Sequence, residues 1–224
     1  MQAVTIDDSF ELLARLKALG FDNPSRDPWW WPRSGSFETL VGAILTQNTR
    51  WERVEISLEH LRNEGVLDPE KFLSYPETSL QALIRPSGFH TAKARNLKEI
   101  SRKLLEDFGS FEEFRQSVDR AWLLSRRGVG PETADAILNY ACYREAFVVD
   151  SYTSRLLEAL GYMPESYDAV QGWMLEGIEG RCGELFPDLS RAQCFARSHG
   201  MIVEYCKKHR RARAIETAPL LKIS

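Results

Sequence analysis

The sequence of 224 residues has no long apolar run, and this absence bears on where the protein works. No hydrophobic stretch approaches the roughly 20 residues that a membrane-spanning helix needs. The first residues also lack the basic and then apolar pattern of a secretory signal peptide. We therefore expect a cytoplasmic protein with no membrane partner, and a monomer is the default expectation for its assembly.

Cysteine is scarce as well, and its four copies lie far apart in the sequence. No two of them form the Cys-X-X-Cys pair that marks many metal and redox sites. Disulfides are rare in the cytosol. The spacing therefore favours buried free thiols, so that packing alone holds the C-terminal region. The four residues are Cys142, Cys182, Cys194 and Cys206.

Positive charge is not in excess, because 29 Lys and Arg residues against 32 Asp and Glu residues give a net charge of −3. Proteins that bind nucleic acid usually carry a basic face, so any such face must come from local clusters. Each cluster could equally be an ordinary solvated surface. The clusters are Lys93, Arg95, Lys98, Arg102 and Lys103, then Arg126 and Arg127, then Lys207, Lys208, His209, Arg210, Arg211 and Arg213.

What the sequence does contain is one helical pattern after another. Apolar residues recur at the spacing of amphipathic helices, without strand-like alternation or an internal repeat. We therefore predict an all-α fold, with Asp7 or Asp8 as the N-cap of its first helix. The expected helices cover residues 6–19, 37–46, 51–62, two short stretches within 67–84, 91–108, 111–118, 122 to near 125, one that opens at 131, 151–160, 167–178 and 189 to about 211.

The stretch from 122 to 150 carries the clearest motif, because a tight turn joins two of these helices. A helix that ends near Ser125 is followed by Gly128 to Gly130 and by a helix that opens at Pro131. Glycine permits a positive φ angle, and proline suits the first helical position. This is a helix-hairpin-helix pattern. The unpaired backbone N–H groups around Gly128, Gly130 and Thr133 can bind an anion such as a phosphate.

An aspartate ends the same stretch, directly after the apolar run from Phe147 to Val149. Asp150 comes at the expected start of the helix at 151–160. The helix dipole and free N–H groups favour its charged form. The carboxylate could be a helix N-cap, the commoner role of such an aspartate, or a catalytic group, and the two roles are compatible.

These residues resemble the endonuclease III-like, helix-hairpin-helix-GPD superfamily of DNA glycosylases. The string GVGPETADAIL followed by VVD is similar to the family's hairpin and catalytic aspartate. LVGAILTQNTRWERV and RPSGFHTAKARNL also match, in the family's order. The run WWWP at 29–32 narrows the resemblance to the bacterial 3-methyladenine DNA glycosylase branch. The resemblance implies two helical lobes. One is a six-helix barrel at 33–138, and the other combines 1–32 with 139–224, with the hairpin and Asp150 at the cleft.

Two departures from the family pattern define the expected chemistry. Endonuclease III carries four closely spaced cysteines that hold an iron–sulfur cluster, and that pattern is absent here, so we expect no iron–sulfur cluster and no other cofactor. Bifunctional relatives place a lysine in the slot of Glu132, where its amine attacks C1′ of the sugar. A carboxylate cannot do this. The resemblance therefore implies a monofunctional enzyme that leaves an intact abasic site, and Glu132 also suits the helix dipole.

The resemblance places Trp30, Trp31 and Pro32 in the base pocket. A 3-methyladenine base is positively charged, so an aromatic face offers both stacking and cation–π attraction. Trp51, expected one helical turn beyond Gln47 on the same face, would form the other wall. The tryptophans could instead fill the seam between the lobes, and Trp51 could be a core aromatic. Lys207 aligns with a lysine near the pocket of relatives, although a lysine in a basic run needs no special role.

The expected partner is damaged double-stranded DNA with one nucleotide flipped out of the helix. In relatives the glutamine matching Gln47 fills the resulting hole, where its amide can pair with the orphaned base. Phe89 matches a second wedge. The alternatives are an ordinary turn at Gln47 and a hydrophobic staple at Phe89. Phosphate contacts are expected from Arg126, Arg127 and the backbone at Gly128, Gly130 and Thr133, and a monovalent cation is possible on the carbonyls of Leu124, Arg126 and Val129.

We therefore predict a monofunctional DNA glycosylase that excises alkylated purines such as 3-methyladenine in base excision repair, acting at the bacterial nucleoid. Asp150 would stabilise the oxocarbenium-like sugar and orient the attacking water. One alternative is a bifunctional glycosylase and lyase that acts on other damaged bases. Another is a non-catalytic DNA-binding module that uses the hairpin only to clamp phosphates.

Overall fold

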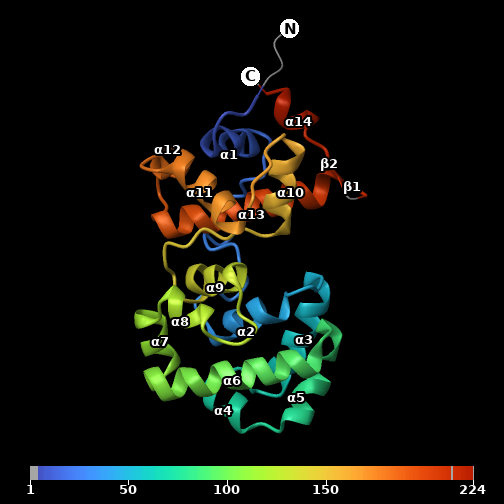
Figure 1. Cartoon of the computed structure of the whole chain (residues 1–224), viewed down its shortest axis with the longest axis vertical. Coiled ribbons are helices and arrows are strands. Elements are labelled where there is room, and N and C mark those ends of the chain that lie inside the picture. The colour runs from blue at the N-terminus through green and yellow to red at the C-terminus, as the bar shows by residue number, and fades with distance from the viewer. Residues whose placement is uncertain (1–4, 213, 224) are drawn as a thin grey trace. The chain divides into compact units, whose positions relative to one another are not determined.

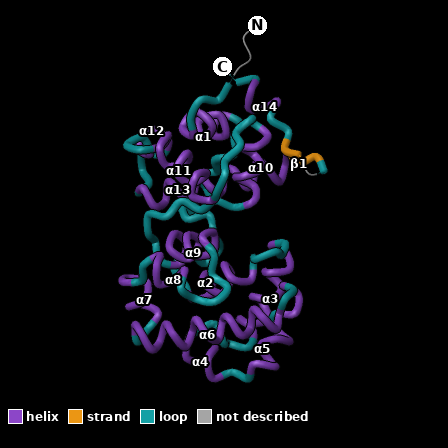
Figure 2. The backbone as a smooth tube through the Cα atoms, viewed as in Figure 1, coloured by secondary structure: helices purple, strands orange, loops and turns teal. Residues whose placement is uncertain are grey.

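Capping side chains begin several helices where the sequence places them. The computed structural model describes residues 5–212 and 214–223. Asp8, the second of the two expected caps, accepts a hydrogen bond from the N–H of Glu11 (2.7 Å) and starts α1 (Ser9–Ala18). Ser36 caps α2 (Phe37–Leu45) in the same way. The described chain is all-α, as predicted, apart from one pair of very short strands (Figures 1 and 2).

The chain divides into two compact units. Unit 1 comprises Met1–Trp31 and Glu145–Ser224, and unit 2 comprises Pro32–Arg144. The second boundary lies after Arg144, later than the expected position 138. The reason is that the π-helical segment η2 (Ile137–Ala141) is buried within unit 2, where the carbonyl of Tyr140 accepts a hydrogen bond from the N–H of Gly35 (2.7 Å).

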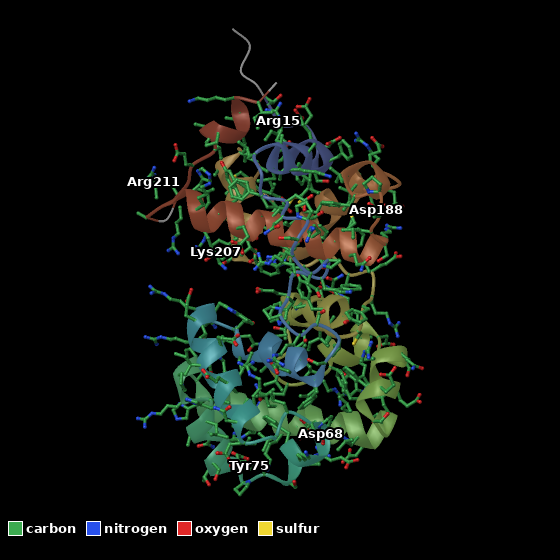
Figure 3. All side chains as sticks on the ribbon, turned by 180° about the vertical axis from the view of Figure 1, so that it is seen from behind. Arg15, Asp68, Tyr75, Asp188, Lys207 and Arg211 are labelled. Atoms are coloured by element: carbon green, nitrogen blue, oxygen red, sulfur yellow. The ribbon has the colours of Figure 1, made fainter. Side chains whose placement is uncertain are left out.

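Unit 2 is built around α2, all of whose residues are buried. This explains why its sequence shows no polar face. The helix packs against α3, α6, α9 and η2, while α6 also packs against α4 and α5. Asp68 caps α4 through the N–H groups of Glu70 and Lys71 (Figure 3). The remaining elements are α3 (Trp51–Asn63), α4 (Pro69–Ser74), α5 (Glu77–Leu83), the 3₁₀ turn η1 (Arg85–Ser87), α6 (His90–Phe108), α7 (Phe111–Ser117), α8 (Arg120–Leu124) and α9 (Pro131–Ala136).

Unit 1 is built around the long helix α13 (Arg191–His209), which packs against α1, α10 and α12. The expected range of 189 to about 211 was too long. A capping box between Ser190 and Gln193 begins the helix, and Arg210 takes an extended conformation that ends it. The other helices of this unit are α10 (Ser151–Ala159), α11 (Tyr167–Ile178), α12 (Cys182–Leu185) and α14 (Ala218–Leu221).

The sequence analysis missed the shortest elements of unit 1. Helices α12 and α14 are too short for an apolar period to show. The strands β1 (Arg210–Arg211) and β2 (Ala214–Ile215) pair antiparallel, with Arg210 opposite Ile215. They arise where the basic run after α13 turns back on itself.

Within the described residues, no helix combines the length and the apolar character that crossing a membrane would require. All four cysteines are free, and three of them are buried. Over the same residues, no three His, Cys, Asp or Glu side chains are grouped so that they could hold a metal ion.

Candidate active site and nucleic-acid interface

Asp150 is the N-cap of α10, in the position that the sequence predicts. Its Oδ1 accepts hydrogen bonds from the N–H groups of Tyr152 and Thr153 (2.9 Å each) and from the hydroxyl of Thr153 (3.1 Å). The side chain is 16% exposed. One carboxylate oxygen is thus committed to the start of the helix, which fixes the direction in which the other points.

The second oxygen of Asp150 contacts a histidine that the sequence analysis did not identify. Oδ2 lies 3.5 Å from Nε2 of His199, a side chain on α13 that is 5% exposed. Burial raises the pKa of Asp150, but the nearby imidazole of His199 and the bonds from Thr153 outweigh it, so the pKa is lowered. Asp150 is therefore a carboxylate at neutral pH. It can stabilise a nearby positive charge or orient a water molecule.

His199 also contacts the first of the predicted pocket tryptophans. The ring of Trp30 meets the imidazole edge to face, with centroids 5.4 Å apart. The Arg26 guanidinium lies 5.4 Å from the centre of the same indole. Gly200 allows this approach, because a Cβ atom there would come within 2.5 Å of the indole carbons. The His-Gly pair in the middle of α13 was the available signal, but only packing shows what it contacts.

The tryptophan run does not present three similar faces. Trp31 is buried, with 8% of its surface exposed, whereas Trp29 and Trp30 are half-buried. Pro32 is exposed and begins unit 2. Trp30 has a φ angle of 61°, a left-handed conformation that is costly for a bulky residue. Within unit 1 it is therefore Trp30 that lies beside the Asp150–His199 pair, while the base-binding role of the run remains a prediction.

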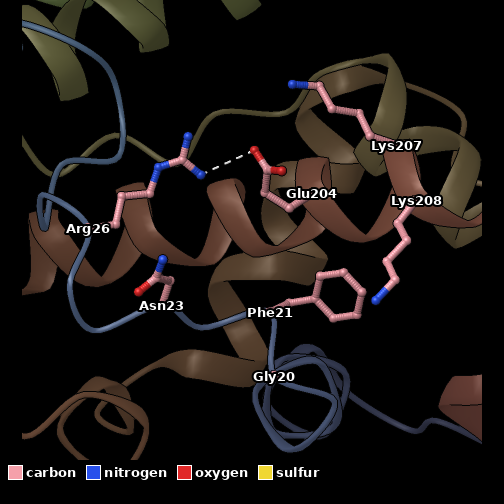
Figure 4. Close-up of a pocket in the computed structure, with 7 residues that line it drawn as sticks. All are labelled: Gly20, Phe21, Asn23, Arg26, Glu204, Lys207 and Lys208. Carbon is pink, nitrogen blue, oxygen red and sulfur yellow. Dashed lines mark hydrogen bonds and ion pairs between the residues drawn. The ribbon is translucent and has the colours of Figure 1, made fainter.

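Lys207 is exposed on the surface of unit 1. It lines a shallow pocket in which Arg26 and Glu204 form an ion pair at 3.2 Å (Figure 4). Lys207 and Lys208 extend from α13 in different directions, and Lys208 lies 5.4 Å from the ring of Phe21. None of the residues that line this pocket is a tryptophan. The pocket is lined by Gly20, Phe21, Asn23, Arg26, Glu204, Lys207 and Lys208.

The hairpin of unit 2 has the predicted boundaries, but its two glycines serve different purposes. Gly128 has a φ angle of 77°, and a Cβ atom there would lie 2.1 Å from the side-chain nitrogen of Asn96. Gly130 has an ordinary φ of −94° and is the N-cap of α9. No atom would meet a Cβ at Gly130. The turn therefore requires a glycine at 128, whereas Gly130 leaves the backbone before α9 open.

The two arginines of the hairpin also differ from each other, in how far their side chains are exposed. Arg126 folds back on α8, with its guanidinium 4.6 Å from the centre of the Trp122 ring and Nη2 bonded to the hydroxyl of Ser125 (2.7 Å). Arg127 is exposed. The carbonyl of Arg126, one of the three proposed for a cation, accepts the N–H of Val129 at 3.2 Å. A carbonyl has a second lone pair, so the cation remains a prediction.

Gln47 contacts the hairpin directly. It lies in the turn between α2 and α3, and its Nε2 donates to the carbonyl of Gly128 (2.8 Å) and to the hydroxyl of Thr133 (2.9 Å). The expected common helical face with Trp51 was wrong. Helix α2 ends at Leu45, Asn48 takes a left-handed φ of 53°, and Trp51 is the first residue of α3.

Phe89 has the features of an exposed wedge. Its side chain is 68% exposed, and its φ of 47° places it in the left-handed region just before α6. A hydrophobic staple would bury the ring, so this exposure weighs against that alternative. Glu132 is exposed in the first turn of α9, where a negative charge suits the helix dipole.

Apart from the exposed Arg95, the basic stretch on α6 does not form a free cationic face. Lys93 is buried. Arg102 pairs with Glu99 and with Glu106. Lys98 bonds to the carbonyl of Tyr75, and Lys103 pairs with Glu106. Of the C-terminal run, Lys207 and Arg211 project from the surface (Figure 3), and Arg213 lies outside the described residues.

Comparisons with known proteins agree with these features. The model of the HhH-GPD superfamily of base excision DNA repair proteins matches residues 41–178. A protein of Methanocaldococcus jannaschii named "Putative DNA repair glycosylase MJ1434" is 38% identical over 216 residues, which cover 93% of each chain. The structure of H. pylori 3-methyladenine DNA glycosylase bound to 1,N6-ethenoadenine is 41% identical, covers 92% of this chain and 100% of its own, and superposes with a TM-score of 0.87. A non-covalent endonuclease III–DNA complex shares the fold, with a TM-score of 0.74 at 21% identity over 96% of this chain and 94% of its own.

Proposed function

Because this chain belongs to the HhH-GPD superfamily of base excision DNA repair proteins, we propose that it is a monofunctional DNA glycosylase that excises alkylated purines such as 3-methyladenine. The observation that carries the proposal is the Asp150 carboxylate. Its N-cap bonds hold it in one orientation, and these bonds together with the nearby His199 lower its pKa.

Cleavage of an N-glycosidic bond passes through an oxocarbenium-like sugar. An anion near C1′ stabilises that positive charge, and the same carboxylate can orient the water that attacks from the face opposite the base. In our proposal Asp150 performs both steps. Oδ1 stays bonded to the start of α10, and Oδ2 acts on the sugar and the water.

Support for a monofunctional reaction comes from Glu132. A lyase step needs an amine that attacks C1′ and forms a Schiff base. Glu132 occupies the position where bifunctional relatives carry their lysine, and a carboxylate cannot form that adduct. Hydrolysis would then leave an intact abasic site.

Support for an alkylated purine comes from leaving-group chemistry and from Trp30. A base that is already positive on its ring leaves readily, so no general acid is needed. An aromatic face attracts such a base by stacking and by a cation–π interaction. Trp30 lies beside His199 in unit 1, and the H. pylori relative is itself a 3-methyladenine DNA glycosylase.

Damaged double-stranded DNA is the proposed partner, bound through unit 2. The open backbone before α9 suits a phosphate, and exposed Arg127 adds positive charge. The exposed ring of Phe89 suits insertion between bases. Gln47 suits the space left by a flipped nucleotide, once its amide exchanges its bonds to Gly128 and Thr133 for bonds to a base.

Asp150→Asn tests the proposal. Asparagine can still cap α10, so the fold should persist, but the charge is lost, and release of 3-methyladenine in single turnover should fall at least about a hundredfold. Asp68→Asn is the matched control, because Asp68 is also a helix N-cap, and it should retain full activity. If Asp150→Asn released the base as fast as the wild type, the carboxylate would have no catalytic role.

Borohydride trapping separates the proposed enzyme from a bifunctional one. We expect no covalent adduct with a duplex containing 3-methyladenine or with one containing an oxidised pyrimidine. A trapped adduct would establish a lyase step. A protein that binds DNA tightly but releases neither base would be a DNA-binding module instead.

A further inference from the structure

A single buried lysine joins the turns of unit 2 that carry Gln47 and Phe89. Lys93 is 4% exposed. Its Nζ lies 2.8 Å from the carbonyl of Leu45, 2.9 Å from the hydroxyl of Thr49 and 2.8 Å from the carbonyl of Ser87. The first two acceptors flank Gln47, and the third lies just before Phe89. The three protons of the ammonium therefore match three acceptors on the two turns.

Other bonds tie the same two turns together. The hydroxyl of Thr49 donates to the carbonyl of Ser87, so the Gln47 turn contacts the Phe89 turn directly. The backbone N–H of Lys93 donates to the carbonyl of Phe89 (2.9 Å). Lys93 thus holds the Phe89 turn with both its main chain and its side chain.

The Phe89 turn also contains a residue in an unfavourable backbone conformation. Phe89 has a φ angle of 47°. A left-handed conformation costs free energy for a bulky residue such as phenylalanine, and it persists only where the surroundings impose it. The bonds of Lys93 to the carbonyls of Ser87 and Phe89 lie on either side of this position and contribute to that constraint.

The network continues from Gln47 to the hairpin. The Gln47 amide donates to the carbonyl of Gly128 and to the hydroxyl of Thr133. Hydrogen bonds therefore link three segments that are distant in sequence: the Phe89 turn, the Gln47 turn and the hairpin.

Stability alone does not explain a lysine at this position. Its three acceptors are neutral, and burial lowers its pKa to about 8. Burying an ammonium without a carboxylate is unfavourable, and apolar residues often replace buried charges without loss of stability. We therefore attribute the presence of Lys93 to the two turns that its hydrogen bonds connect.

We propose that Lys93 is a positioning residue for base flipping, which holds the Gln47 and Phe89 turns at a fixed separation so that both side chains enter the duplex as one unit. The inference rests on the proposed function, because it assumes that both side chains enter DNA. Its test needs only DNA binding and no base release.

The test is a double-mutant cycle with a duplex that carries a tetrahydrofuran abasic-site analogue. The Kd is measured for Gln47→Ala, Phe89→Ala and the double variant, each with Lys93 and with Lys93→Met. With Lys93 present, the factor by which the double variant raises the Kd should differ by about threefold or more from the product of the factors for the two single variants. In the Lys93→Met background, the factors for the two single variants should simply multiply. Lys93→Met alone should raise the Kd about tenfold.

Two further variants keep the test interpretable. Lys71→Met removes the same charge from an exposed site on α4 of the same unit, and it should leave the Kd and the coupling unchanged. Thr49→Val keeps the side-chain shape but removes the hydroxyl that links Lys93 to Ser87. It should weaken the coupling even if Lys93→Met fails to fold.

Thermal melting monitored by circular dichroism confirms which variants are folded. The proposal is wrong if folded Lys93→Met keeps both the wild-type affinity and the wild-type coupling, because the lysine would then be only structural. It is also wrong if the two single losses simply multiply in the wild type. Coupled binding without any release of 3-methyladenine would contradict the glycosylase proposal alone.

Discussion

His199 and the first turn of α10 together favour the ionised form of Asp150. His199 approaches Oδ2 from α13, while the N–H groups of α10 hold Oδ1. These contacts lower the pKa of Asp150 in spite of its burial. The interaction stabilises the fold at pH values above the ordinary pKa of 3.8 and is lost as the pH falls through the lower folded-state pKa.

Removing the imidazole should therefore move the pH profile of the reaction. In His199→Leu the pKa of Asp150 rises, so the acidic limb of the single-turnover rate should shift to higher pH. His199→Gln keeps a hydrogen-bond donor, so its acidic limb should lie between those of the wild type and His199→Leu. An acidic limb at the same pH in all three proteins would show that His199 only fills space.

At the scale of secondary-structure elements, the α8–α9 hairpin depends on one glycine. Gly128 has a positive φ, and its missing Cβ makes room for Asn96 of α6, whereas a Cβ at Gly130 would meet nothing. The Gln47 amide bonds to the carbonyl of Gly128. A change at Gly128 therefore disturbs both the hairpin and the turn that carries Gln47.

The two glycines form a matched pair of substitutions. Gly128→Ala should destabilise unit 2 by about 1–2 kcal/mol, because alanine disfavours the left-handed region, and it should weaken binding to the abasic duplex. Gly130→Ala changes the side chain equally without strain and should change stability little. Urea unfolding and fluorescence anisotropy measure the two effects. Equal losses of stability from the two substitutions would contradict this account of the hairpin.

At the scale of the whole molecule, the net charge of −3 limits how the protein can hold DNA. Acidic side chains neutralise much of the basic stretch on α6, and Lys93 is buried. Arg127 remains exposed. Affinity should therefore come from a few phosphate contacts together with inserted side chains, rather than from a broad basic surface.

Salt dependence measures this directly. We expect log K to fall with log salt concentration with a slope shallower than about −5, since each phosphate contact contributes about −0.9. Arg127→Ala should reduce the slope by about one. Arg126→Ala should change it less, because Arg126 is folded against Trp122 and Ser125. A slope near −10 would indicate a large basic interface instead.

Much of the fold could be predicted because its causes are local. Side-chain caps begin α1, α2 and α10, and a glycine and a proline shape the hairpin, so each boundary depends on residues close together in sequence. The position of Asp150 at a helix start and of Glu132 in the first turn of α9 followed in the same way. The short elements α12, α14, β1 and β2 contain too few residues for a pattern to show.

Only the tertiary structure decided which partners these residues contact and how deeply they are buried. The contact of His199 with Asp150, the bonds of Gln47 to the hairpin and the three acceptors of Lys93 each join segments that are distant in sequence. The burial of Trp31 depends on packing in the same sense. Helix periodicity shows which face of a helix is apolar, but it carries no information on which distant segment covers that face. For this reason a lysine on a seemingly basic helix could be a buried link between two turns.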